Sequence, residues 1–320
     1  MALVTLAEIE AAAARIRPVA RVTPLLEVSW PTAGAGQLLL KCENLQPMGA
    51  FKIRGAYNML AQLPKEELQG GVITYSSGNH GQAVALAAKT LGVRAVVVMP
   101  TTAPAVKVEG AQAYGAEVTF AGTTSLERKQ RAEELARERG LTIIPPFDHS
   151  MIIAGQGTVG LEILEQCPSV STVLVEVGGG GLSSGVSAAI KQRAPHVRVV
   201  GVEPEGAPKM KRSLEAGHVV TLDKTGSIAD GLLTIRPGDL TFEHVRAFVD
   251  DVVTVPDEAM VRAIAWLFRN ARLVVEPSGS VTVAALMRNL GGVDVSRGPV
   301  VAIVSGGNVE AEQYARYIGQ

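Results

Sequence analysis

The chain has 320 residues, enough for about two domains or one large one. Hydrophobic residues make up 47% of the sequence and charged residues 19%, so the chain can bury a large core and is not predominantly disordered. The 30 basic and 31 acidic side chains leave a formal net charge of -1, and only 4% of the residues are aromatic. This balance offers no sequence-wide binding surface to nucleic acid or to an anionic membrane, so we expect neither as a partner.

The N-terminal segment and the two cysteines predict a cytoplasmic location. Thr5 and Glu8 form a capping box that opens an amphipathic helix, a pattern that is not typical of a signal peptide. Cys42 and Cys167 lie far apart and match no disulfide or metal-binding spacing. The apolar runs fall well short of the about 18 residues that span a bilayer. We therefore expect a soluble protein with two free thiols.

Strands and helices alternate along the chain from about residue 38. We expect strands at residues 38–41, 72–75, 94–99, 117–120, 141–144, 197–202 and 300–304. We expect helices at residues 82–91, 106–114, 125–139 and 182–193. Residues 173–177 are interpreted as a continuous apolar strand, and residues 210–250 as irregular connection. The alternation predicts an α/β protein whose parallel-rich sheets are covered by helices on both faces.

Three turns that follow buried strands are candidate ligand sites, because parallel sheets bind ligands at the carboxyl ends of their strands. They are residues 76–80, 178–181 and 305–308. The second turn consists of Gly178, Gly179, Gly180 and Gly181 ahead of a helix. Free N–H groups and the positive helix end favour a phosphate there, although a tight packing turn also uses glycine. A dinucleotide site is a weaker alternative, because Ser183 replaces the third glycine of that motif.

Lys52 lies among apolar and small neighbours in the segment MGAFKIRGA, at the expected start of a helix. A lysine that loses its hydration has a lowered pKa, and the neutral amine is the form that makes a Schiff base. Most lysines are solvated surface groups, so this segment alone leaves both interpretations open.

The turn at residues 76–80, SSGNH, offers hydroxyls, a side-chain amide and consecutive N–H groups at the start of a helix. These groups suit a carboxylate, and they also suit a plain N-cap. His80 by itself is more typical of a structural histidine than of a base. Ser305 belongs either to a plain turn or to a site in which its hydroxyl meets a ligand.

Several segments form a joint pattern in a fixed order along nearly the whole chain. They are NLQ at 44–46, FKIRGA at 51–56, SSGNHGQ at 76–82, AGQGT at 154–158, GGGG at 178–181, GVEP at 201–204, EPSG at 276–279 and SGGN at 305–308. This pattern resembles the serine/threonine dehydratase and serine racemase family. Its members are pyridoxal-phosphate enzymes of the tryptophan-synthase-β fold, fold type II.

The resemblance assigns roles around the cofactor. It implies that Lys52 is the Schiff-base lysine and the general base, that Phe51 packs against the pyridine ring, and that Asn79 hydrogen-bonds the phenolic oxygen of the ring. The phosphate is held by Gly178, Gly179, Gly180, Gly181 and Leu182. Ser305 faces the pyridine nitrogen, with Glu276 nearby.

The resemblance also assigns a substrate site and an architecture. The substrate carboxylate is surrounded by Ser76, Ser77, Asn79 and His80. A large lobe of residues 1–70 and 149–320 carries a small inserted lobe of residues 71–148, with the cofactor between them and a break at Pro145 and Pro146. A homodimer is implied. The chain ends twelve residues after Asn308, so we expect no C-terminal regulatory domain.

The implied activity is that of a pyridoxal-phosphate-dependent dehydratase, an ammonia-lyase acting on a small amino-acid substrate. It eliminates water from a β-hydroxy amino acid such as L-threonine or L-serine, and the products are a 2-oxo acid and ammonia. A hydroxyl at the ring nitrogen, in place of a carboxylate, does not hold that nitrogen protonated. The ring is then a weaker electron sink, which favours elimination over transamination.

Other activities stay open. One is serine racemase activity, in which Ser77 protonates the face of Cα opposite Lys52 and so counts as a catalytic candidate. Another is a different β-hydroxy substrate, such as 3-hydroxyaspartate, phenylserine or a compatible-solute intermediate, with Phe147 and residues 228–236 as possible pocket walls. A thiol β-replacement is disfavoured, because the turn at residues 76–80 departs from the Thr-Gly-Asn-Thr loop of cysteine synthases. A non-catalytic pyridoxal-phosphate or NAD-binding protein is the alternative from another class.

The chain departs from the family at a divalent-cation site. By resemblance that site uses Glu203, the carbonyl of Ala207 and an acidic residue at position 209, where this chain has Lys209. An ammonium group at that place repels Mg²⁺ or Ca²⁺, so we expect no bound metal. Either Lys209 puts its own charge where the ion would be and pairs with Glu203, or its side chain points to solvent.

Overall fold

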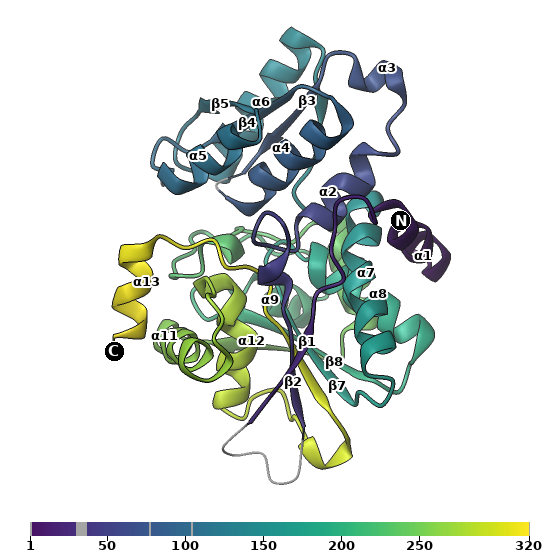
Figure 1. Ribbon diagram of the computed structural model, residues 1–320, viewed down its shortest axis with the longest axis vertical. Helices are drawn as coiled ribbons and strands as arrows, with labels where there is room; N and C mark the ends of the chain where they lie inside the picture. The colour runs from purple at the N-terminus through teal and green to yellow at the C-terminus, as the bar shows by residue number, and fades with distance from the viewer. Residues whose placement is uncertain (1, 30–36, 77, 104, 320) are drawn as a thin grey trace.

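A computed structural model describes residues 2–29, 37–76, 78–103 and 105–319 of the chain. Within these residues the chain forms two sheets, a four-stranded one at the top of Figure 1 and a six-stranded one below it. The smaller sheet has the order β5-β4-β3-β6, and all its neighbouring strands are parallel. Its strands are β3 (Val72–Tyr75), β4 (Ala95–Met99), β5 (Glu117–Phe120) and β6 (Thr142–Ile143).

The larger sheet has the order β1-β2-β10-β7-β8-β9, and its neighbouring strands are parallel except for the antiparallel pair β1 and β2. Its strands are β1 (Leu25–Val28), β2 (Leu38–Lys41), β7 (Thr172–Glu176), β8 (Arg198–Pro204), β9 (Asp251–Val255) and β10 (Val300–Ile303). The architecture is therefore mixed α/β with parallel-rich sheets, as the sequence predicts.

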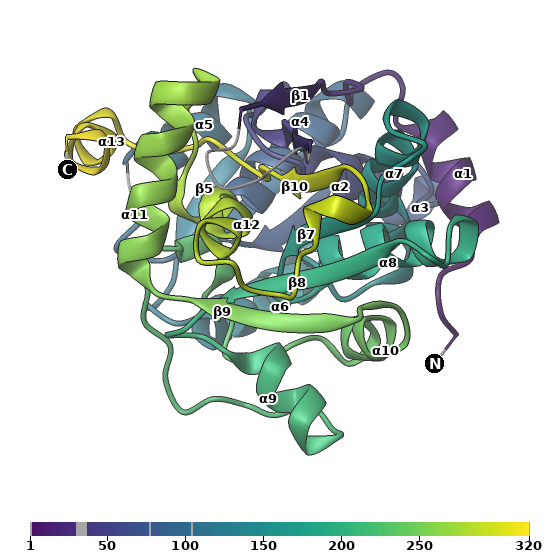
Figure 2. The same cartoon turned by 90° about the horizontal axis from the view of Figure 1, so that it is seen from below.

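Helices cover both sheets (Figures 1 and 2). The α-helices are α1 (Leu6–Arg15), α2 (Ile53–Leu60), α3 (Lys65–Leu68), α4 (Asn79–Leu91), α5 (Ala105–Ala113), α6 (Ser125–Arg139), α7 (Ser150–Gln166), α8 (Gly181–Arg193), α9 (Lys209–Ala216), α10 (Asp239–Phe248), α11 (Asp257–Trp266), α12 (Pro277–Met287) and α13 (Ala311–Ile318). Short 3-10 segments are η1 (Glu43–Leu45), η2 (Asp230–Leu232) and η4 (Val295–Arg297), and a π-helical turn is η3 (Leu267–Ala271).

The two faces of β7 show how the larger sheet is buried. Leu174 packs into a core with residues of α12, while Val173 and Val175 pack into a separate core with residues of α8. Figure 2 shows these two helices on opposite sides of the sheet. A strand buried on both faces carries apolar residues without alternation, and this is why the sequence pattern locates it.

Two expectations about these elements are wrong. Residues 210–250 are not irregular, because they contain most of α9, together with η2 and α10. Met210 of α9 packs with Phe242 and Val245 of α10, residues spaced about one helical turn apart on their helix. Residues 173–177 are not a continuous apolar strand either, because Glu176 is the last residue of β7 and is buried.

The lobe boundaries at residues 71 and 148 stay a prediction. The four-stranded sheet uses residues from 72 to 143. However, Met48, Ile53 and Leu60, which precede residue 71, share a core with residues of α4. No helix within the described ranges is both long and apolar enough to cross a membrane.

Candidate active site

Lys52 lies at the N-terminal end of α2, as the sequence predicts. Its ammonium nitrogen donates a hydrogen bond of 2.8 Å to the carbonyl of Pro146 and lies 5.2 Å from the centre of the Phe51 ring. Loss of hydration inside the protein lowers the pKa of this amine to about 8. A substantial fraction of Lys52 is therefore neutral near physiological pH, and the neutral amine is the nucleophilic and basic form.

The last turn of the larger sheet lies directly against the Lys52 segment. The N–H of Phe51 donates to the carbonyl of Ser305 at 3.1 Å, and Ala50 forms an isolated antiparallel bridge with Gly306. The N–H of Glu276 donates to the carbonyl of Gly306, also at 3.1 Å. These backbone bonds bring Phe51 together with Glu276 and Ser305, which both lie more than 200 positions later in the sequence.

The four consecutive glycines form the turn between β7 and the N-terminus of α8. Gly180 has a φ of +100°, a backbone conformation that side chains with a Cβ rarely adopt. A Cβ at Gly179 would lie only 2.4 Å from the Phe147 ring. Local packing therefore requires glycine at these two positions, and the free N–H groups at the start of α8 form an anion-binding surface. Leu182 follows in the first turn of α8 and is buried.

Phe147 connects the glycine turn to Lys52. Its ring packs over Gly179, and the preceding residue, Pro146, accepts the hydrogen bond from the Lys52 amine. The backbone carbonyl of Gly231 and the side chain of Leu232 approach Gly178 from η2. The residues expected to form pocket walls thus lie beside the glycine turn.

The turn that precedes α4 contacts the same region through Asn79. Its amide nitrogen donates to Oε1 of Glu276 at 2.5 Å, and its amide oxygen accepts from Nδ2 of Asn308 at 2.8 Å. Ser76 Oγ accepts the N–H of Gly78 at 3.2 Å, so this hydroxyl stabilises the turn. Ser77, which the sequence singles out as a catalytic and substrate-binding candidate, lies outside the described residues.

His80 is buried in the first turn of α4, and its Nε2 lies 3.2 Å from the carbonyl of Ile144. Burial and the nearby charge of Lys52 lower the pKa of this imidazole to about 3. His80 is therefore neutral at physiological pH and cannot supply a positive charge to a carboxylate. Its Nδ1 is buried and has no partner among the described residues.

Glu276 is a buried carboxyl at the N-terminal end of α12. Burial and the charge of Asp230 raise its pKa to about 7, while Lys107 opposes the shift. Lys107 on α5 forms an ion pair with Asp230 of η2. This pair links a helix of the smaller sheet to a segment beside the glycine turn, and the sequence did not indicate it.

A second residue that sequence reasoning missed is Glu176. Its Oε1 accepts the N–H of Ser305 at 3.1 Å, and its Oε2 is buried without a partner among the described residues. A single glutamate within an otherwise apolar strand, directly before the glycine turn, was the signal that could have identified it.

Lys209 is buried at the start of α9, so its side chain does not point to solvent. Its ammonium lies 3.0 Å from Oε1 of Glu203. It also donates to the carbonyls of Val177, Ala207 and Leu232 at 3.0 to 3.1 Å. Within the described ranges, no group of three or more His, Cys, Asp or Glu side chains is arranged to hold a metal ion.

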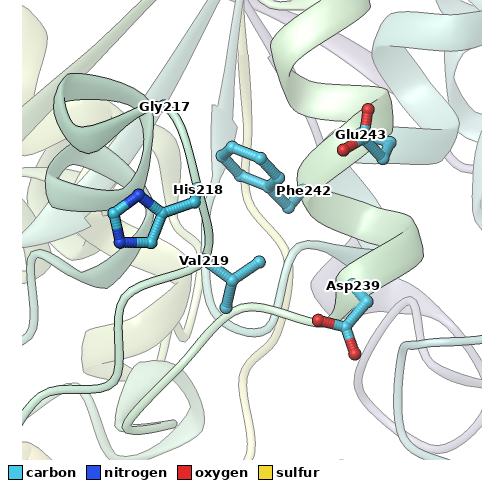
Figure 3. Close-up of a pocket in the computed structure, with 6 residues that line it drawn as sticks. All are labelled: Gly217, His218, Val219, Asp239, Phe242 and Glu243. Atoms are coloured by element: carbon cyan, nitrogen blue, oxygen red, sulfur yellow. The ribbon is translucent and has the colours of Figure 1, made fainter.

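A separate pocket of about 360 Å³ lies on the surface between the end of α9 and α10 (Figure 3). Its lining contains none of the residues that the sequence assigns to a site. Its polar side chains, His218, Asp239 and Glu243, are spread around its rim in Figure 3. The candidate catalytic residues therefore lie around Lys52 and not in this pocket.

Comparison with known proteins places this geometry in a family context. The family model described as pyridoxal-phosphate dependent enzyme matches residues 16–306. An L-threonine ammonia-lyase of Thermotoga maritima is 42% identical over 319 residues, which cover 99% of this chain and 79% of that protein. A serine racemase of Schizosaccharomyces pombe is 39% identical over 321 residues, which cover 100% of this chain and 99% of that protein.

The similarity extends to solved structures and to longer proteins. The structure of maize serine racemase matches with a TM-score of 0.93 and 39% identity, over 99% of this chain and 98% of that chain. A biosynthetic L-threonine dehydratase of Pasteurella multocida is 39% identical over 96% of this chain, which spans only 60% of that protein's length. Lyases and racemases thus occur among the relatives at similar identity.

Proposed function

The chain belongs to the pyridoxal-phosphate dependent enzyme family, and from this premise we propose that it is an ammonia-lyase that eliminates water from a β-hydroxy amino acid. L-Threonine and L-serine are the proposed substrates, and the products are a 2-oxo acid and ammonia. The observation that carries the proposal is the Lys52 amine, whose pKa is lowered to about 8 and which bonds the carbonyl of Pro146, next to the Phe147 ring that packs over the glycine turn.

The described residues fit pyridoxal phosphate. The glycine turn offers N–H groups to a phosphate, Lys52 offers a partly neutral amine to an aldehyde, and the buried Oε2 of Glu176 lacks a partner beside Ser305. When bound, the cofactor supplies an electron sink for the negative charge that develops at Cα of an amino acid. We propose that Gly178 to Gly181 and Leu182 hold the phosphate, and that Ser305 meets the ring nitrogen.

Lys52 is the proposed base. Its amine removes the proton from Cα of the substrate, and its lowered pKa keeps a usable fraction in the basic form at neutral pH. Its contact with the carbonyl of Pro146 fixes the amine at the end of its flexible side chain. A base held in one place removes the orientational disorder from the proton-transfer step.

The substrate carboxylate is proposed to bind at residues 76–80. Because His80 is neutral, this binding relies on N–H groups at the start of α4 and on hydroxyl and amide side chains. Asn79 is held on both sides of its amide, by Glu276 and by Asn308, so its position is fixed before a ligand arrives. Phe51 is proposed to pack against the pyridine ring.

Asn79 and Lys107 also connect the two proposed lobes. Both residues belong to the small lobe of residues 71–148, and their partners belong to the large lobe. Asn79 bonds with Glu276 and Asn308, and Lys107 pairs with Asp230. These contacts tie the two proposed lobes together beside the proposed substrate site. Enclosure excludes water, which would otherwise screen the charge at the reacting carbon.

The choice of elimination rests on the 42% identity to a threonine ammonia-lyase. Racemisation of serine is a second candidate, and the specific observation that favours it is the match to a serine racemase over the full length of both proteins. Ser77 is its proposed second acid.

The test is a 2-oxo acid assay with L-threonine, L-serine, 3-hydroxyaspartate and phenylserine, run alongside a measurement of D-serine formed from L-serine. We expect 2-oxobutanoate from threonine or pyruvate from serine to exceed D-serine. D-Serine as the main product from serine, without a 2-oxo acid from any of the four substrates, would overturn the lyase assignment. The Lys52→Ala variant is the control for cofactor reactions that occur without the enzyme.

A further inference from the structure

Glu176 is a buried acid that the proposed mechanism does not use. Its side chain is only 3% exposed. Its Oε1 accepts the backbone N–H of Ser305 at 3.1 Å, and its Oε2 has no hydrogen-bond partner among the described residues. Buried polar atoms are almost always paired in native proteins, so an unpaired carboxyl oxygen needs an explanation.

The topology of the larger sheet explains why these two residues meet. Strands β7 and β10 are parallel neighbours, with Leu174 opposite Ala302. Glu176 stands two residues further along, at the carboxyl end of β7, and Ser305 stands three residues further along, just past the end of β10. The carboxyl ends of parallel strands are where such sheets bind ligands. The Glu176 carboxyl therefore lies at the ligand edge of the sheet.

The surroundings of Glu176 favour its neutral form. Burial raises the pKa of its carboxyl well above the ordinary value, and hydrogen bonds from the backbone and side chain of Ser305 oppose this shift only in part. The negative charge of Glu276 raises the pKa further. In the apo-protein at neutral pH Glu176 therefore keeps its proton, and Ser305 is its hydroxyl-bearing neighbour.

We propose that Glu176 is a positioning residue that acts through Ser305 and delivers a proton to the ring nitrogen of the cofactor. In this relay Glu176 gives its carboxyl proton to Oγ of Ser305, and Ser305 gives its own hydroxyl proton to the ring nitrogen. One O–H bond breaks and one forms at Ser305, Glu176 becomes a carboxylate, and the added positive charge on the ring is balanced by that carboxylate. The net charge of the site does not change.

This inference rests on the proposed function for the placement of Ser305 at the ring nitrogen. It changes one element of that function. A serine alone leaves the ring nitrogen unprotonated, whereas a serine backed by an acid supports the protonated form, which is the stronger electron sink. The site then stabilises charge at Cα more strongly than a single hydroxyl can, and racemisation accompanies elimination more readily.

The decisive experiment measures the protonation state of the ring nitrogen directly. Holoenzyme is prepared with pyridoxal phosphate that carries ¹⁵N in the ring, and its ¹⁵N NMR shift distinguishes a protonated from an unprotonated nitrogen. Glu176→Gln keeps the size of the side chain and an oxygen for the Ser305 N–H but cannot supply the proton. Glu276→Gln tests the other buried carboxyl near the site as the proton source, because Glu276 bonds Asn79 and does not contact the Ser305 amide.

We expect the protonated shift in the wild-type enzyme and in Glu276→Gln, and the unprotonated shift in Glu176→Gln and Ser305→Ala. An unprotonated nitrogen in the wild-type enzyme overturns the relay outright, even if Glu176→Gln fails to fold. A protonated nitrogen that persists in Glu176→Gln also overturns it. The NMR measurement needs only bound cofactor, so it still tests the relay if the enzyme is not a lyase. Conversely, an unprotonated nitrogen in the wild-type enzyme overturns the relay but not the lyase assignment.

Infrared spectroscopy gives a second readout that needs no activity. Because Glu276, with a pKa of about 7, would add a band of its own, the spectra are taken in the Glu276→Gln background. There the apo-protein should show the C=O band of a protonated buried carboxyl, and the band should be absent when Glu176→Gln is added. Loading with pyridoxal phosphate should remove the band from the Glu276→Gln protein, because Glu176 then becomes a carboxylate. A band that is unchanged on loading contradicts the proposed proton transfer.

Discussion

The ammonium nitrogen of Lys209 lies 3.0 Å from a carboxylate oxygen of Glu203, and neither side chain is exposed to solvent. The same ammonium donates to the carbonyls of Val177, Ala207 and Leu232, so four oxygens surround one positive charge. Val177 directly precedes the glycine turn, and Leu232 packs against Gly178. The arrangement resembles the oxygen shell of a bound cation, with the cation tethered to the chain.

We expect Lys209→Met to destabilise the protein by about 3–5 kcal/mol, because it leaves the buried Glu203 carboxylate without its ion-pair partner and with only the N–H groups of Met210 and Lys211 to stabilise its charge. The measurement is the free energy of unfolding from denaturant titration. Lys224→Met is the control, since the same change at an exposed lysine should stay within about 0.5 kcal/mol of the wild type. A loss below about 1 kcal/mol for Lys209→Met would show that the pair contributes little.

Removal of divalent metal should leave the wild-type enzyme unchanged, because the Lys209 ammonium already neutralises Glu203. We expect equal activity and equal thermal midpoints in EDTA and in Mg²⁺. Activity that EDTA abolishes and Mg²⁺ restores would contradict the view that Lys209 replaces an ion.

Lys52→Ala should lower turnover by at least about 10², since it removes the proposed general base. The fold should survive, because within the described residues the Lys52 side chain contributes one hydrogen bond, to the carbonyl of Pro146. Steady-state kinetics and circular dichroism check the two halves of this expectation. Turnover within about tenfold of the wild type would exclude Lys52 as the base.

The pH dependence of cofactor capture by the apo-protein should report the pKa of Lys52. Only the neutral amine attacks an aldehyde, and with a pKa of about 8 roughly a tenth of Lys52 is neutral at pH 7. The rate of capture should therefore rise about tenfold per pH unit below pH 8 and level off above it. Stopped-flow absorbance measures this rate. N-acetyl-lysine methyl ester is the control, and its rate should keep rising toward pH 10. A protein profile that matches the control would mean that Lys52 has an ordinary pKa.

The sequence predicts the regular elements well where burial on both faces or a strong helical pattern determines them. Strand β3 and helix α6 begin and end where the sequence predicts. It fails at α9 and α10, because glycine and proline between residues 204 and 238 obscure short amphipathic helices. The apolar spacing of Phe242 and Val245 was visible, but a window of ten residues contains too few turns for the pattern to stand out.

The sequence predicts which turns form the candidate site, but it does not predict the side-chain contacts between them. The glycine turn and Ser305 follow the carboxyl ends of neighbouring parallel strands, which meet at one edge of the sheet, and Lys52 stands at a helix start. The contacts that tune them come from pairs that are distant in the sequence. Glu176 with Ser305 and Lys107 with Asp230 are examples, because no local pattern states which buried charges will meet.

Another such network surrounds Arg54, which follows Lys52 by two residues and is fully buried. Arg54 binds Glu43 with two hydrogen bonds of 2.7 Å, and it binds Glu162 with two of 2.6 and 2.9 Å. Lys41 also pairs with Glu162, at 2.6 Å. The network ties α2 to η1 and α7, and so fixes the segment that carries Lys52.

Arg54→Met should therefore cost about 3–5 kcal/mol of folding free energy, because it leaves the buried Glu43 carboxylate without its ion-pair partner and Glu162 with Lys41 alone. Arg54→Lys keeps the charge but cannot form both paired contacts, so we expect it to be destabilised as well and to rescue only part of the loss. Arg139→Met is the matched control, since Arg139 pairs with Glu117 on the surface and such pairs contribute about 1 kcal/mol or less. Denaturant titration of all three variants, with cofactor affinity measured in parallel, checks the expectation. If Arg54→Met and Arg139→Met lose the same stability, the buried network does not hold the Lys52 segment in place.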